Sequence, residues 1–155
     1  MFSYTDGESP DRTSFGHYVH SDRFGGTHLE LDPGVAPDPA ATRWGPYRAA
    51  GVIPADQIPA ALPTGSPICV LTSRGAVRCG ETLSVNTGHL SATFHDSGLA
   101  PGDSGSLLFA VANGDAYAVS LITDGGAGTD PRYNTVTSVY LSPILDRLCV
   151  DLMTG

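Results

Sequence analysis

The feature that most restricts the fold of this chain is a series of short apolar segments, separated by turn residues, between residues 67 and 140. Apolar or alternating segments bounded by Gly, Asp, Asn and Ser are typical of strands joined by tight turns. The predicted strands are residues 68–72, 76–78, 81–85, 90–94, 106–111, 116–123 and 135–140. With 19 Gly and 12 Pro in the chain, this succession predicts an all-β fold, an antiparallel barrel or sandwich.

The length and charge of the chain limit its organisation and its partners. Its 155 residues suffice for one domain with a substantial core. The 16 Asp and Glu against 8 Lys and Arg give a formal net charge of -8, which speaks against nucleic acid or an anionic membrane as a partner. No apolar run has the length of a membrane span, and the polar N-terminus lacks the apolar core of a signal peptide.

The N-terminal part mixes Gly, Ser, Asp and aromatic residues, which predicts an irregular arm over residues 1–24 with a short strand near residues 16–20. Residues 27–31 alternate apolar and polar side chains and predict a second strand. The residues here that invite a metal interpretation are His17, His20, Asp22 and His28. Because an irregular arm does not impose tetrahedral geometry, we interpret them as solvated and expect neither a metal nor another cofactor.

Two other segments depart from the strand pattern. Six prolines in residues 35–65 argue against a regular helix or a central strand and predict an extended surface connector. Residues 142–152 predict an amphipathic helix, with Ser142 as N-cap and Pro143 in the first turn. Cys149 falls on its apolar stripe and is therefore expected to be a packed, unreactive thiol.

Cys69 and Cys79 flank a hairpin whose turn is predicted at Arg74 and Gly75. The hairpin would bring the two cysteines opposite each other, so a disulfide between them is geometrically reasonable. Two buried free thiols are the alternative in a reducing cytosol. Three cysteines in all are too few for a disulfide-dense scaffold.

The stretch with the most specific chemistry is residues 101–106, Pro-Gly-Asp-Ser-Gly-Ser. A serine between Gly and Asp residues can expose its hydroxyl group at a tight turn. The preceding glycine lets two backbone N–H groups point at one spot, as an oxyanion in acyl transfer requires. An ordinary loop turn is the alternative, because Gly, Asp and Ser are the commonest turn formers.

Taken together, several features resemble one family in order and spacing. They are Cys69, the ten-residue step to Cys79 and Gly80, the Gly-Asp-Ser-Gly turn, the strand that follows it and the terminal helix. The sequence resembles chymotrypsin-like (trypsin-like) serine peptidases of the bacterial secreted branch that includes alpha-lytic protease. The resemblance implies a Greek-key β-barrel over residues 49–155, the second of the family's two barrels. Residues 1–48 would be an arm, a linker and a remnant of the first barrel.

The resemblance also implies roles for individual residues. Ser104 would be the nucleophile, the N–H groups of Gly102 and Ser104 the oxyanion hole, and Asp103 the buried carboxylate that orders the turn. The residues implied in substrate binding are Gly98, Leu99, Ala100, Thr123, Asp124 and Gly125. The first three are small or apolar, so a small or apolar substrate side chain before the scissile bond is expected.

The sequence departs from the family where the general base and its orienting acid should stand. A serine hydroxyl is a poor nucleophile unless a histidine takes its proton and a carboxylate orients that histidine. Nothing before residue 49 reproduces the family's histidine stretch, and the nearest carboxylate to the expected acid is Asp22. Residues 86–89, Asn-Thr-Gly-His, resemble the end of that stretch, but His89 precedes Ser104 by only 15 residues. His89 is therefore a candidate base with a turn histidine as the alternative, and His95 is no better placed.

Two functional hypotheses follow. The first is a serine endopeptidase lineage that hydrolyses polypeptides through Ser104 and is incomplete or inactive as this chain alone. The second is a non-catalytic barrel that serves in binding or assembly, as a homodimer or with a partner chain covering the face the first barrel would occupy. The family implies secretion, whereas this sequence shows no signal peptide.

Overall fold

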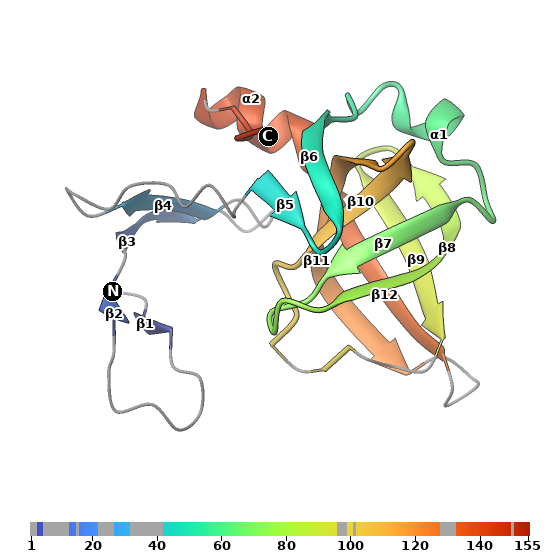
Figure 1. Ribbon diagram of the computed structural model, residues 1–155, viewed down its shortest axis with the longest axis horizontal. Coiled ribbons are helices and arrows are strands. Elements are labelled where there is room, and N and C mark those ends of the chain that lie inside the picture. Colours follow the sequence, from blue (N-terminus) through green and yellow to red (C-terminus); the bar gives the residue numbers. More distant parts are fainter. Residues whose placement is uncertain are drawn as a thin grey trace. The chain divides into compact units, whose positions relative to one another are not determined.

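The computed structural model describes residues 42–95, 99–100, 102–127, 133–149 and 151–155, together with four short strands nearer the N-terminus. These are β1 (Ser3–Tyr4), β2 (Thr13–Ser14), β3 (Gly16–Ser21) and β4 (Thr27–Leu31) (Figure 1). The chain divides into two compact units, Met1–Asp38 and Pro39–Gly155. In the first unit β1 pairs with β2 and β3 with β4, both antiparallel. The strands predicted at residues 16–20 and 27–31 are therefore present.

The second unit contains one eight-stranded sheet and two short helices, α1 (Ile58–Ala61) and α2 (Ser142–Leu148). The strands are β5 (Arg43–Trp44), β6 (Tyr47–Val52), β7 (Pro67–Leu71), β8 (Val77–Asn86), β9 (His89–His95), β10 (Leu107–Ala112), β11 (Asp115–Ala127) and β12 (Tyr133–Tyr140). Strands β7 to β12 follow the order β10-β7-β8-β9-β12-β11, and a pairing of β10 with β11 closes them into a barrel. All six pairings around the barrel are antiparallel.

The barrel contains a Greek key. Strands β7, β8 and β9 follow one another as hairpins, and β10 returns to lie beside β7, which gives the spatial order 4-1-2-3 (Figure 1). The connection from β9 to β10 crosses one end of the barrel and carries Ser104. The predicted all-β antiparallel barrel with a C-terminal helix is confirmed, and it is compatible with a chymotrypsin-like barrel.

Alternation along the strands separates the apolar residues into two layers. The barrel interior contains Ile68, Val70, Leu90, Ala92, Phe94, Leu108, Val119, Ile122, Val136 and Tyr140. The outward-facing layer, over β7, β10 and β11, contains Trp44, Ala49, Cys69, Phe109, Ala116, Ala118 and Leu141. The Trp44 ring lies 5.4 Å from that of Phe109, so the β5–β6 hairpin covers this outer face.

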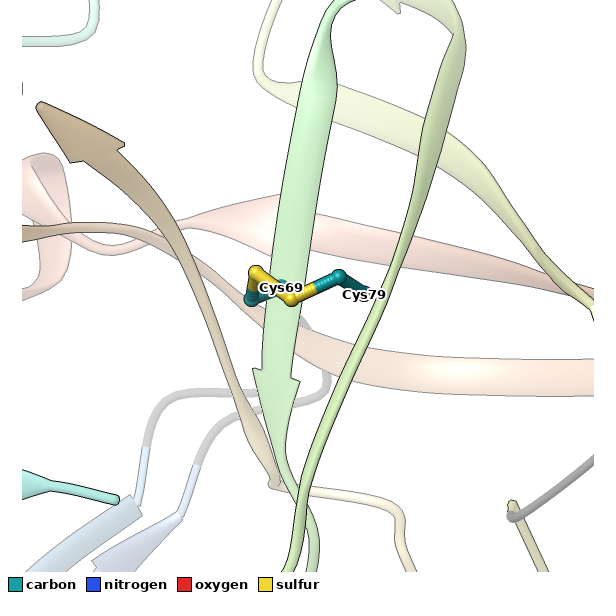
Figure 2. The surroundings of a disulfide bond; sticks show 2 residues. All are labelled: Cys69 and Cys79. Carbon is teal, nitrogen blue, oxygen red and sulfur yellow. A yellow bond between two sulfur atoms is a disulfide. The ribbon is translucent and has the colours of Figure 1, made fainter. Parts of the chain in front are cut away.

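A disulfide joins Cys69 on β7 to Cys79 on β8, as Figure 2 shows. The two residues are direct partners in the antiparallel register, so the predicted cross-hairpin bridge is confirmed. Cys69 is buried under the outer layer, whereas Cys79 is exposed. The next residue, Gly80, lies against β9: a Cβ there would collide with the carbonyl oxygen of Thr93 and approach Phe94 Cδ1 to 2.9 Å.

The connector predicted over residues 35–65 is wrong in its described part. Strand β6 lies inside the sheet, between β5 and β11, and pairs in parallel with β11. The prolines at 46 and 54 fall outside β6 and leave its backbone N–H groups free to pair. Helix α1 accommodates Pro59 in its first turn, where no intrahelical donor is lost.

The terminal helix begins at Ser142 as predicted, but two expectations about it are wrong. Its N-cap is Leu141, and the Ser142 hydroxyl group instead accepts a hydrogen bond from the Ala55 N–H at 2.9 Å. The helix ends at Leu148 because Cys149 adopts a left-handed conformation with φ of 53°. That turn directs the Cys149 side chain to solvent, where it is an exposed free thiol. In the described residues, neither helix is long and apolar enough to cross a membrane.

Candidate active site

The Ser104 turn is shaped by two glycines and by backbone hydrogen bonds. Gly102 has φ of 104° and Gly105 has φ of 88°, conformations that residues with a Cβ rarely adopt. The Asp103 N–H donates to the Ala100 carbonyl oxygen at 3.0 Å, which closes a tight turn before Ser104. The Gly105 N–H donates to the Ile122 carbonyl oxygen at 2.7 Å and fixes the turn against β11. Ser104 is exposed at the resulting corner.

The side chain of Asp103 fixes the turn through hydrogen bonds to its carboxylate. Asp103 is 6% exposed, and its Oδ2 atom accepts a hydrogen bond from the Ala100 N–H at 2.8 Å. Its Oδ1 atom accepts two from Ser73 in the β7–β8 loop, from the N–H at 2.9 Å and from the hydroxyl group at 2.7 Å. Three donors therefore compensate for the burial of the carboxylate.

These contacts keep Asp103 ionised. Burial alone would raise the pKa of Asp103, but the hydrogen bonds from Ala100 and Ser73, with the positive charge of Arg74, outweigh it and leave the pKa below its usual value. The negatively charged carboxylate of Asp103 therefore stabilises the turn.

The backbone N–H groups around Ser104 fall into two sets. Among the backbone hydrogen bonds of the described residues, the N–H groups of Asp103, Gly105 and Ser106 have acceptors, whereas those of Gly102 and Ser104 have none. The two N–H groups without an acceptor are that of the nucleophile candidate itself and that of the residue two positions before it. Such a pair is available to the oxyanion that would form on the carbonyl oxygen of a substrate attacked by the Ser104 hydroxyl group.

Ser104 also lines a cavity of about 380 Å³ at the end of the barrel. Its described lining residues are Leu99, Ala100, Asp103, Ser104, Ile122, Asp124, Gly125, Gly126, Asn134, Thr135 and Val136. Ile122 and Val136 are almost fully buried, so the interior side of the cavity is apolar. Asp124 is exposed and bonds locally, its Oδ1 atom accepting the Gly125 N–H at 2.8 Å.

Part of this cavity was not predicted from the sequence. Asn134, Thr135 and Val136 come from β12, and the Asn134 side-chain amide donates to the Leu99 carbonyl oxygen at 3.3 Å. Gly125 pairs with Val136 across the sheet. Residues 123–125 were predicted to line the site. Their pairing partners on β12 could have been predicted from the register of the β11–β12 hairpin. Ser73 gave no signal of its own beyond its place in a predicted turn.

The structure does not bring the candidate base His89 to Ser104. His89 begins β9, whereas the cavity residues Asn134 and Thr135 pair with Phe94 and Thr93 near its other end. The two ends of β9, His89 and His95, are six residue steps or about 20 Å apart. His95 pairs with Tyr133 at the cavity end. No histidine is among the described residues that line the cavity.

Of the other residues predicted for the site, one lies within the described structure and two do not. Thr123 lies on β11 at a register shift and donates its hydroxyl group to the Thr137 carbonyl oxygen at 3.1 Å. Gly98 and Asp22 lie outside the described residues. In the part of the chain that the structure describes, no three His, Cys, Asp or Glu side chains gather as metal ligands.

One edge of β11 is open beside the cavity. β11 pairs with β12 up to Ala127, whereas its pairing with β10 ends at Leu121. Among the described strands, none pairs with residues 123–127 on the β10 side. An unpaired edge of this kind can add a further extended strand.

A comparison of the chain with models of protein families and with curated protein sequences finds no match.

Proposed function

We propose that this barrel belongs to the serine endopeptidase lineage and that Ser104 is its nucleophile. The observation that carries the proposal is the exposed Ser104 at a cavity, where its own N–H group and that of Gly102 have no acceptor among the described residues. The Ser104 Oγ atom attacks a peptide carbonyl carbon, and the N–H groups of Gly102 and Ser104 stabilise the oxyanion. A base takes the Oγ proton and returns it to the leaving nitrogen, so that the tetrahedral intermediate expels the amine and leaves an acyl group on Ser104.

The substrate in this proposal is an extended polypeptide. Its backbone pairs with the open edge of β11 at residues 123–125, as in β-strand addition. The side chain before the scissile bond enters the cavity, whose apolar side is formed by Ile122 and Val136. A small or apolar side chain fits this lining best.

The proton of Ser104 needs an acceptor that the described cavity lining does not supply. We therefore infer that activation depends on an imidazole from elsewhere, in the remaining sequence or on a second chain, with residues 49–155 acting as the second barrel of the family. The disulfide fits an oxidising compartment, which agrees with a secreted protein.

A labelling experiment tests this proposal. A fluorophosphonate probe acylates activated serines, so we expect weak labelling of the parent chain that rises with added imidazole, which substitutes for a missing base. Ser104→Ala should abolish the labelling at every imidazole concentration. Thr87→Ala, which removes an exposed hydroxyl group from the β8–β9 turn, is the matched control and should label like the parent. Absence of any Ser104-dependent labelling with imidazole present would overturn the proposal.

The second candidate function is a non-catalytic binding module. It is favoured by the absence of histidine from the described lining of the cavity. In this case a partner chain, or a second copy, presents an extended segment to β11, and Ser104 contributes only a contact. Such a protein binds a peptide equally well with or without the Ser104→Ala substitution, and it shows no imidazole-dependent labelling.

A further inference from the structure

Hydrogen bonds within the β7–β8 loop fix its conformation independently of its contact with the Ser104 turn. The Thr72 N–H donates to the Ala76 carbonyl oxygen at 2.9 Å, and the Gly75 N–H donates to the Thr72 carbonyl oxygen at 2.9 Å. The Thr72 hydroxyl group accepts the Ala76 N–H at 3.1 Å. Ser73 is thus held in a loop whose own hydrogen bonds set its direction.

The strands that carry this loop are braced as well. The Cys69–Cys79 disulfide joins β7 to β8, and β7 also pairs with β10, where Leu71 lies opposite Leu107. The loop therefore has a fixed position relative to the start of β10. The Ser104 turn leads directly into that strand.

The two loops meet at one carboxylate. Ser73 lies 30 residues before Asp103 in the sequence, and both of its donors, the N–H and the hydroxyl group, converge on Asp103 Oδ1. The other oxygen of Asp103 is bound within the turn, to the Ala100 N–H. The Ser73–Asp103 contact thus connects the turn to a rigid external support, and Arg74 is the charged neighbour that acts on the same carboxylate.

We propose that Ser73 is a positioning residue that, through Asp103, aims the N–H groups of Gly102 and Ser104 at a common point. Asp103 lies between these two residues, so its backbone angles set the orientation of the Ser104 N–H group relative to the Gly102 N–H group. Without the Ser73 hydroxyl group, Oδ1 retains one donor of two and the carboxylate is less firmly held. The catalytic meaning of this role rests on the proposed function, whereas the positioning itself does not.

The test compares three variants of the full chain. Ser73→Ala removes the hydroxyl donor, and Ser73→Thr keeps it. Thr87→Ala removes a hydroxyl group from the exposed β8–β9 hairpin loop and is the matched control. Thermal unfolding first establishes that each variant is folded. The amide nitrogen and proton resonances of Gly102 and Ser104 are then followed by NMR as a function of pH.

In the parent, these amide resonances should titrate with Asp103. In Ser73→Ala we expect the midpoint to rise by about one pH unit, because a hydrogen bond to the charged form is lost. Ser73→Thr and Thr87→Ala should keep the parent midpoint. A folded Ser73→Ala variant with the parent midpoint and unchanged amide shifts would overturn the proposal. So would a Ser73→Thr variant that behaves like Ser73→Ala.

Labelling of Ser104 by the fluorophosphonate is the second measurement. We expect Ser73→Ala to label about tenfold more slowly, and Ser73→Thr and Thr87→Ala to label at the parent rate. If the parent is not labelled at all, the proposed peptidase function fails, while the amide titration still decides the role of Ser73. If labelling is normal in Ser73→Ala despite a shifted titration, the positioning does not extend to the oxyanion-binding groups and the proposal is overturned.

Discussion

The two ends of the barrel are held together in different ways. At the Ser104 end, a long connection is fixed by a buried carboxylate that accepts three hydrogen bonds. At the His89 end, the β8–β9 turn is fixed by neutral groups. The Tyr140 hydroxyl group donates to the Asn86 carbonyl oxygen at 2.7 Å, and the Tyr140 N–H donates to the Gly88 carbonyl oxygen at 3.1 Å.

The difference indicates that the His89 end of the barrel serves stability, whereas the Ser104 end is arranged for the proposed reaction. A tight hairpin such as the one before His89 needs only local backbone bonds and one tyrosine to be stable. The Ser104 turn leaves two N–H groups without acceptors among the described residues and therefore needs support from outside. Changes at the Ser104 end should affect reactivity and pH dependence, and changes at the His89 end should affect stability alone.

The largest effect is expected for Asp103→Ala. Removal of the carboxylate leaves the partly buried donors of Ser73 and Ala100 without their acceptor, so we expect a loss of about 2 kcal/mol in the free energy of unfolding. Ser104 labelling should fall at least a hundredfold. Urea unfolding and probe labelling measure the two effects. Asp146→Ala, at an exposed position on α2, is the control and should change neither.

The next effect is the acid dependence of stability. The pKa of Asp103 is lower in the folded chain than in the unfolded one, so its ionisation stabilises the fold. This contribution is complete above about pH 4 and is lost as the pH falls through the folded-state pKa. Urea unfolding at pH 5.5 and at pH 3 should show a smaller loss in Asp103→Asn than in the parent. Equal losses in the two proteins would contradict the role assigned to this charge.

A smaller effect is expected for Tyr140→Phe at the other end. The variant loses the hydrogen bond to Asn86, which corresponds to about 1 kcal/mol in the free energy of unfolding. Burial raises the pKa of Tyr140, so the hydroxyl group stays neutral and this loss should be the same at pH 5.5 and pH 8. Labelling of Ser104 should be unchanged. A drop in labelling would show that the two ends of the barrel are coupled.

The smallest effect is expected inside the sheet, away from both ends. The buried Thr82 hydroxyl group belongs to a residue that is 1% exposed, and it has no hydrogen-bond partner in the described structure. Thr82→Val keeps the shape and removes this polar group, so we expect a gain of up to about 1 kcal/mol in the free energy of unfolding. Thermal unfolding measures it, with Thr87→Ala as the exposed control. A destabilised Thr82→Val would mean that the hydroxyl group is bound.

The sequence was most informative where the pattern is local. Short segments bounded by turn residues placed β9, β10 and β12 within two residues of their ends, and the hairpin between Cys69 and Cys79 predicted their bridge. Prediction from the sequence failed where the conformation of a segment depends on its pairing strand or on the backbone angles of a single residue. Strand β6 survives among prolines because β11 pairs with it, and a left-handed residue, invisible in an apolar stripe, ends α2 at Cys149.

The site was only partly readable for the same reason. Residues 102–106 contain the proposed nucleophile and the proposed oxyanion donors in one short stretch, so the N–H groups of Gly102 and Ser104 could be named from it. Ser73 and the β12 wall of the cavity reach the turn only through the closed barrel. No local sequence pattern identifies a serine 30 residues away as a hydrogen-bond donor to Asp103.

The Greek-key crossing also sets an order of assembly. The Ser104 turn lies in the connection between β9 and β10, and its contact with Ile122 needs β11 in place. A nascent chain that ends before residue 122 can form the β7–β8 and β8–β9 hairpins, because their contacts are local, but it cannot shape the turn. During synthesis, the Ser104 turn can therefore take its final shape only after Ile122 is available, later than the two hairpins.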